Sequence, residues 1–311
     1  MIRDVRVPKA TESKGVDGMG AYARLAALFA ALTALFVVFG WAIGSLMYND
    51  WVGGVLWFLV LAGAMNLFAY FASDKIVLWS YRAKIVTEAE APELHRIVRQ
   101  VSQMANLPMP RVALVPTDTP NAFATGRSPK RSVVAVTQGI LRLLSEDELR
   151  GVLAHEISHV GNRDVLVMSV AATIAGAISF MARMFWWNSL FGGSRNREGN
   201  GLAALLAVVG MVLAPVAAAF LQLAISRGRE YKADHTGAKT IGDPLSLASA
   251  LEKLEAANRR RPLRFGSPAS QGLFIVNPFS GGGLVRIFSS HPPIQERVAR
   301  LRALARGVDQ Y

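Results

Sequence analysis

The chain has 311 residues, of which 52% are hydrophobic and only 18% are charged, and its mean hydropathy is +0.30. A chain of this length with so little charge is too apolar for an ordinary soluble protein, so the composition predicts a membrane protein. The chain contains no cysteine, which excludes disulfides, thiolate nucleophiles and cysteine-ligated zinc sites. Any metal must therefore be bound by His, Asp or Glu.

The formal charge of +12 comes from 34 Lys and Arg residues against 22 Asp and Glu residues. Such an excess suits either a nucleic acid or an anionic lipid surface. The basic residues cluster beside long uncharged runs, and no zinc-finger, RNP or helix-turn-helix pattern accompanies them. The sequence therefore predicts membrane lipids as partners and no nucleic acid.

Two uncharged runs, Leu25–Asn49 and Trp51–Ser73, follow an N-terminal tail at residues 1–24. Each is long enough to cross a bilayer core, which needs about 20 helical residues. Since Asp50 alone separates the runs, they predict a tight transmembrane hairpin over residues 25–73. A signal peptide is the alternative for the first run, but its apolar stretch is too long and no small-residue cleavage site follows.

A second candidate hairpin covers residues 165–226, where Val165–Ala182 and Gly201–Ser226 are also free of charge. Together the two hairpins predict four transmembrane helices. The first of these later runs is only 18 residues long, and Pro215 interrupts the other. Burial inside a protein core therefore stays open as an alternative for this pair.

The distribution of Lys and Arg predicts the orientation of the chain. The turn of the first hairpin has no basic residue, whereas the tail before it carries Arg3, Arg6, Lys9, Lys14 and Arg24. The N-terminus is therefore expected in the cytoplasm. Because an even number of crossings returns the chain to the same side, the polar regions 74–164 and 227–311 are expected there too.

The polar regions predict a mainly helical domain with a small sheet. Apolar residues recur at a helical period over Ala91–Ala105. Three short β-prone segments, expected as an antiparallel sheet, are Arg111–Val115, Asn121–Thr125 and Ser132–Val136. Ser145 followed by Glu148 matches a capping box, which predicts the start of a helix that continues through Val160.

The sequence His155-Glu156-Ile157-Ser158-His159 on that helix is an HExxH motif. The spacing places both imidazoles on one helical face, where they can meet one zinc ion, and puts Glu156 within reach of a bound water. An accidental match is the alternative, and the well-capped helix argues against it. The polar ends of the helix, SEDELR and GNRD, predict a site in the aqueous phase beside the membrane.

A catalytic zinc site needs a third protein ligand and an open position for water. The metzincin pattern is excluded because residues 162 and 165 are Asn162 and Val165. Glu230 and Asp234 lie one helical turn apart directly after the fourth apolar run, and a closed second hairpin would bring Glu230 to the histidines. Ordinary surface charge on a helix is the alternative for this acidic pair.

The segments HEISHVGNRD and SRGREYKADHTGA, joined by a hydrophobic hairpin, resemble the M48 family of membrane metallopeptidases, and most closely its HtpX group, over nearly the whole chain. The resemblance implies a zincin-type fold and one Zn²⁺ per chain, bound by His155, His159 and Glu230. It also implies that Glu156 is the general base and that Asp234 orients a zinc-bound imidazole.

The same resemblance implies further site residues. An edge strand for an extended substrate would be formed by Asn121, Ala122, Phe123 and Ala124. His291, in the sequence Ser-His-Pro-Pro, would stabilise the oxyanion or contact zinc reversibly. A purely structural strand and a plain helix start are the respective alternatives.

Kinship with the HtpX group implies an endopeptidase of damaged or misfolded membrane proteins, acting in quality control and the stress response. The expected place is the bacterial cytoplasmic (inner) membrane, with the active site facing the cytoplasm. One alternative is a protease that processes specific, for example prenylated, substrates. Another is a non-enzymatic membrane scaffold, which would have no use for Glu156. A homo-oligomer is compatible with the sequence but not indicated by it.

Overall fold

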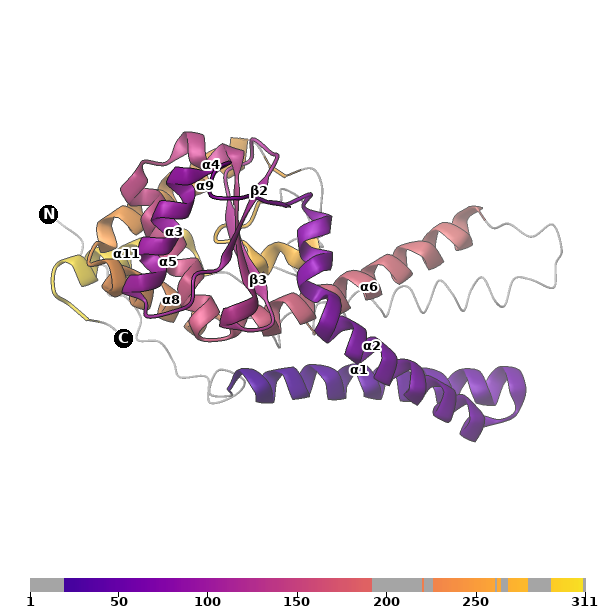
Figure 1. The fold of residues 1–311 in the computed structure, drawn as a ribbon. Coiled ribbons are helices and arrows are strands. Elements are labelled where there is room, and N and C mark those ends of the chain that lie inside the picture. Colours follow the sequence, from indigo (N-terminus) through magenta and orange to yellow (C-terminus); the bar gives the residue numbers. More distant parts are fainter. Residues whose placement is uncertain are drawn as a thin grey trace, which may run out of the picture.

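The computed structural model describes residues 20–191, 220, 226–260, 262–263, 268–278 and 292–309. Helices and a small sheet form a rounded part, and three long helices extend from one side of it (Figure 1). These are α1 (Ala21–Ile43), α2 (Trp51–Ser80) and α6 (Asp164–Phe191). One continuous hydrophobic cluster connects them with the sheet, so the membrane-type helices and the rounded part share a core.

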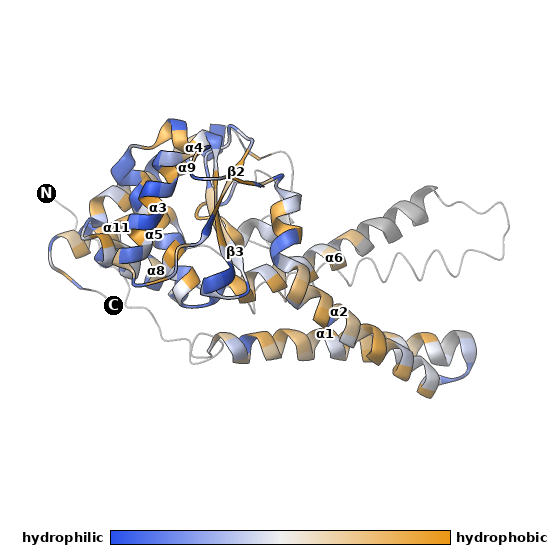
Figure 2. Ribbon diagram, in the orientation of Figure 1, coloured by the Kyte–Doolittle hydropathy of each residue, from blue (hydrophilic) through white to orange (hydrophobic). Residues whose placement is uncertain are grey.

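Helices α1 and α2 form the predicted hairpin. A π-helical turn, η2 (Gly44–Tyr48), ends the first helix, and the Asp50 carboxylate caps the second by accepting from the Gly53 N–H at 2.9 Å. The backbones touch between Gly40 and Gly54, where a Cβ on Gly40 would lie 2.6 Å from the Gly54 carbonyl oxygen. Both helices are long and apolar enough to cross a membrane (Figure 2).

The sheet contains β1 (Lys84–Ile85), β2 (Arg111–Val115), β3 (Ala122–Gly126) and β4 (Ser132–Thr137), in the order β1-β2-β4-β3. The prediction of an antiparallel sheet is wrong, because β2 and β4 are parallel and the sheet is mixed. A parallel pair needs a connection of about a dozen or more residues, and residues 116–131, which include β3, provide it. This path leaves β3 at the edge.

Helix α5 (Glu146–Gly161) packs against other helices and against the sheet, and all of its residues from Gly151 to Val160 are buried. Its predicted start is confirmed: the Ser145 side chain accepts from the Glu148 N–H, and the Glu148 carboxylate accepts from the Ser145 N–H. α5 contacts α3, α8, α9, β3 and β4. The other elements are α3 (Pro92–Met104), η3 (Pro129–Arg131), α4 (Gln138–Leu143), α8 (Arg227–Ile241), α9 (Pro244–Arg260), η5 (Pro268–Leu273) and α11 (Ile294–Ala305).

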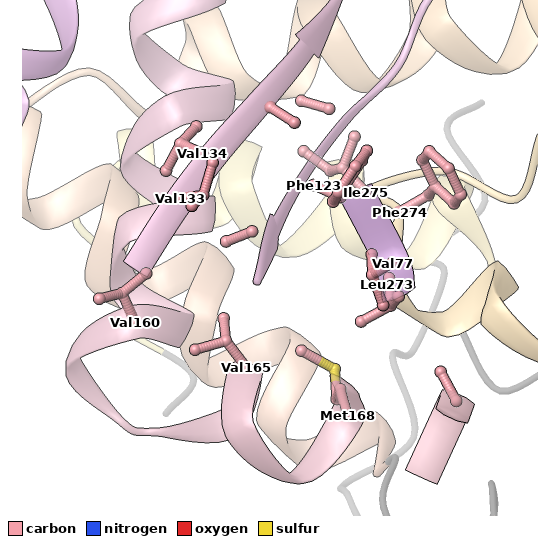
Figure 3. Packing of buried hydrophobic residues seen from close by; sticks show 14 of the residues in the cluster. Val77, Phe123, Val133, Val134, Val160, Val165, Met168, Leu273, Phe274 and Ile275 are labelled. Carbon is pink, nitrogen blue, oxygen red and sulfur yellow. The ribbon is translucent and has the colours of Figure 1, made fainter. Parts of the chain in front are cut away.

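The third apolar run begins inside the protein. The first part of α6 is buried and packs against β3, η5 and α2. Figure 3 shows Val160, Val165 and Met168 below the strands, with Val165 between the other two. Helices α5 and α6 meet at a bend of 85°, and by length and composition this bent pair is a third candidate span. The fourth run lies outside the described residues except for Phe220 and Ser226.

At two glycines, the backbone of a neighbouring helix comes into direct contact with α5. A Cβ on Gly237 of α8 would lie 2.8 Å from the His155 backbone nitrogen, and a Cβ on Gly151 would lie 3.0 Å from the Leu247 Cα of α9. Real side chains do not approach so closely. The spacing between α5 and α8 therefore requires glycine at position 237.

We expect Gly237→Ala to destabilise the protein by about 1–3 kcal/mol, because the added methyl group forces α8 away from α5. The matched control is Gly176→Ala in α6, where an added Cβ meets nothing within 4 Å. Thermal unfolding of both purified variants in detergent measures the effect. Equal melting temperatures for the two variants would show that the close approach is not required.

Candidate metal centre

Two helices bring three ligand atoms together. His155 and His159 lie on α5, and Glu230 lies in the first turn of α8. The two Nε2 atoms are 3.2 Å apart. The nearest Glu230 oxygens lie 3.4 Å from Nε2 of His159 and 3.8 Å from Nε2 of His155. All three side chains are buried, and they form the one group of metal-binding type in the described part of the chain.

These distances suit a tetrahedral zinc ion. Zinc binds nitrogen and oxygen at about 2.0–2.2 Å, which places neighbouring tetrahedral ligand atoms about 3.3 Å apart. The observed separations of 3.2, 3.4 and 3.8 Å lie around this value. Two imidazoles and one carboxylate also leave the fourth position that a hydrolytic site requires. The donor set therefore fits the metal that the sequence resemblance implies.

Asp234 holds the first histidine. Its Oδ1 lies 2.9 Å from Nδ1 of His155, so the Nδ1–H donates to it and the Nε2 lone pair points to the ligand cluster. Arg297 of α11 donates to both oxygens of Asp234 at 2.7 Å and to the Ile275 carbonyl at 2.8 Å. This arginine is completely buried. Asp234 thus lies where the resemblance implies, and Arg297 fixes it.

Asp164 has the same relation to the second histidine, which the sequence analysis did not anticipate. Its Oδ2 lies 3.4 Å from Nδ1 of His159. Its Oδ1 accepts from Arg24 at 2.7 Å and lies 3.6 Å from Nε of Arg229. The sequence feature that could have predicted this contact is the aspartate five positions after the second motif histidine. No signal near the motif pointed to Arg24 or to Arg297.

The surroundings give the two imidazoles different proton affinities. Burial lowers the pKa of His155 to about 4, although Asp234 opposes the shift. Burial acts on His159 in the same direction, but hydrogen bonds with Asp164 and Glu230 outweigh it and raise its pKa to about 10. Without metal, His159 therefore carries the proton of the pair near neutral pH. A bound cation replaces this proton, so metal binding releases it.

Glu156 lies beside the cluster and is only 2% exposed. Burial raises the pKa of its carboxyl to about 8, while the Ala124 backbone N–H and nearby cations oppose the shift. Its Oε1 has no hydrogen-bond partner among the described residues. A buried acid with a free oxygen and a pKa near neutrality is suited to move a proton.

The predicted edge strand is at the sheet edge, but part of it is already covered. Phe123 forms an antiparallel bridge with Phe274, and Ile275 donates its N–H to the Ala122 carbonyl at 3.2 Å. Asn121 donates its side-chain amide to the Val276 carbonyl at 2.6 Å and is buried. Ala124 is the strand residue whose N–H meets Glu156. The predicted His291 lies outside the described residues.

The geometry places the protein in the class of membrane-held metallopeptidases, because a helix-borne HExxH motif and an acid from a second helix converge in a chain that also has a hairpin of membrane-type helices. Comparison with known proteins agrees with this class. The model of Peptidase family M48 matches residues 88–305, so the chain belongs to that family.

Relatives named Protease HtpX homolog match most of the chain. The protein from Syntrophobacter fumaroxidans is 53% identical over 92% of this chain and 100% of its own length. The protein from Pyrococcus furiosus is 52% identical over 93% of this chain and 97% of its own. Among solved structures, S. mikatae Ste24p gives a TM-score of 0.48 at 18% identity, covering 90% of this chain and 65% of that chain.

We expect Asp234→Asn to weaken zinc binding by about 10–100-fold, because the amide no longer orients His155 as the carboxylate does. Competition with a chelator measures the zinc affinity of the purified protein. Asp309→Asn is the matched control, since Asp309 contacts His235 at 2.9 Å on the surface, away from the cluster. Unchanged affinity in Asp234→Asn would contradict an orienting role.

The raised pKa of Glu156 predicts a pH-dependent stability of the metal-free protein. Between its ordinary value of 4.5 and its folded value of about 8, the native state binds a proton that the unfolded state does not. Stability from this group is therefore present below pH 4.5 and lost as pH rises through 8. Glu156→Gln cannot ionise, so it avoids this loss of stability. Its melting temperature should be higher than that of wild type at pH 8 and close to it at pH 5.

Melting curves recorded in chelator over this pH range test the expectation. Glu93→Gln, which changes an exposed glutamate of α3, is the control. Parallel pH dependences for wild type and Glu156→Gln would show that Glu156 ionises normally.

Proposed function

We propose that this protein is a membrane-bound zinc-dependent endopeptidase. One observation carries the proposal: two Nε2 atoms and a carboxylate converge within 4.8 Å of one another, directly beside a buried glutamate whose Oε1 has no partner among the described residues. A membrane scaffold has no need for this arrangement. Membership of Peptidase family M48 supports the same reading.

In the proposed mechanism, His155, His159 and Glu230 hold one zinc ion. A zinc ion bound there would polarise the scissile carbonyl and acidify the attacking water. Glu156 takes the water proton and later gives it to the departing amine. Its carboxyl is buried beside the ligand cluster, and its Oε1 has no hydrogen-bond partner among the described residues, so it can accept the proton there. Asp234 and Asp164 hold the imidazoles in the tautomer that binds metal.

We propose that an extended substrate aligns along the outer edge of β3. Ala124 is closest to the reacting groups, since its N–H faces Glu156. Residues 274–276 occupy the edge next to Ala122 and Phe123. In the described structure, the edge left for a peptide therefore begins at Ala124, and a longer peptide has to displace that segment.

The proposed substrates are damaged or misfolded membrane proteins, handled in quality control during stress. The names of the relatives support a protease of the HtpX type. We further propose that the protein lies in the cytoplasmic membrane with its N-terminus and metal centre in the cytoplasm. The basic tail before α1 and the absence of Lys and Arg from the turn after it support this orientation.

The test compares wild type with Glu156→Gln, both purified in detergent, for zinc content and for cleavage of an unfolded membrane protein. We expect about one zinc in each and a loss of cleavage of about 10²–10⁴-fold in the variant, because the proton carrier is removed. Glu93→Gln, remote from the cluster, should cleave like wild type. Absence of zinc and of cleavage in wild type would instead favour the scaffold.

A further inference from the structure

Arg24 does not lie where a residue that only sets membrane topology would lie. It is in the first turn of α1, directly before the apolar face that begins with Leu25 and Leu28. Its side chain is 4% exposed and points into the protein, where Nη2 donates to Asp164 at 2.7 Å. A charge that serves orientation alone normally extends towards water or lipid headgroups. The direction of this side chain needs another reason.

The burial of Arg24 is unfavourable unless the ion pair has a use. Asp164 is 3% exposed, and a buried ion pair recovers the desolvation of its charges only when the remaining polar groups are satisfied. Within the described ranges, Nε and Nη1 of Arg24 have no hydrogen-bond partner. An apolar side chain would suit this position better if packing of α1 were the only requirement.

Arg24 reaches the metal ligands through one residue. Asp164 accepts from Arg24 with Oδ1 and faces Nδ1 of His159 with Oδ2. On the other side of the cluster, Arg297 donates to Asp234, which faces Nδ1 of His155. Each histidine is thus oriented by a carboxylate, and each carboxylate by a buried arginine.

We propose that Arg24 is a positioning residue of the metal centre. Through Asp164 it holds the imidazole of His159, and so the metal affinity depends on the docking of the first membrane-type helix. This inference rests on the metal site proposed above. Arg229 lies 3.6 Å from the same Asp164 oxygen, so we expect it to keep part of the interaction when Arg24 is changed.

The test uses full-length protein in detergent and measures zinc affinity by chelator competition. We expect Arg24→Gln to weaken binding about tenfold and Arg24→Lys about threefold, because lysine keeps the charge but not the planar set of donors. The matched control is Arg163→Gln. Arg163 is exposed, and its guanidinium lies 5.1 Å from the ring of Tyr22. It therefore contacts the same turn of α1 as Arg24 does, but it forms no ion pair with Asp164 that the structure records. Its loss should leave zinc affinity unchanged.

Two further readouts separate positioning from simple structural support. Arg24→Gln should alter the absorption spectrum of the Co²⁺-substituted protein, since the imidazole of His159 changes its orientation. The double variant Arg24→Gln/Asp164→Asn should bind zinc no more weakly than Asp164→Asn alone, because both changes interrupt one chain of contacts. A purely structural role would lower the melting temperature of the metal-free protein and leave the zinc affinity unchanged.

The proposal is overturned if Arg24→Gln binds zinc like wild type, if Arg163→Gln loses as much affinity, or if the two losses in the double variant add. Should Arg24→Gln not fold, wild-type affinity in Arg24→Lys overturns it equally. If wild type itself binds no zinc, the proposed function fails instead, which the first titration shows before any variant is compared.

Discussion

The constraint on which the structure depends is the burial of a polar helix. Helix α5 carries two histidines and a glutamate into the interior, where water cannot satisfy them. Every imidazole nitrogen that does not face the ligand cluster therefore needs a partner from the protein. Asp234 meets His155 and Asp164 meets His159. The surrounding elements are arranged so that these carboxylates, and the arginines that neutralise them, reach α5 from different sides.

Close packing makes these contacts possible. Gly237 brings α8 to backbone distance from α5, and this approach places Glu230 and Asp234 on either side of the His155 ring. The core is shared with the membrane-type helices, so α1 and α2 do not act only as an anchor. Tyr81 at the end of α2 stacks edge-on against Phe274, which joins α2 to the segment that covers β3.

Local signals in the sequence predicted the parts of the fold that depend on local chemistry. The capping box at Ser145, the hairpin around Asp50 and the HExxH spacing each report on a few neighbouring residues. Strand pairing depends on residues far apart in the sequence, so the parallel contact between β2 and β4 was not predicted. The roles of Arg24 and Arg297 were missed for the same reason, because each meets its carboxylate only after long-range packing.

The positions of the two arginines also decide when the centre is complete. Among the described helices, Arg24 belongs to the first and Arg297 to the last, so the contacts around the histidines join segments that are far apart in the sequence. A ribosome adds about 5–20 residues per second, and the C-terminal helix emerges last. A chain synthesised only as far as α9 carries Arg24 but not Arg297. The contacts around both histidines are therefore complete only after α11 has emerged and packed against α8.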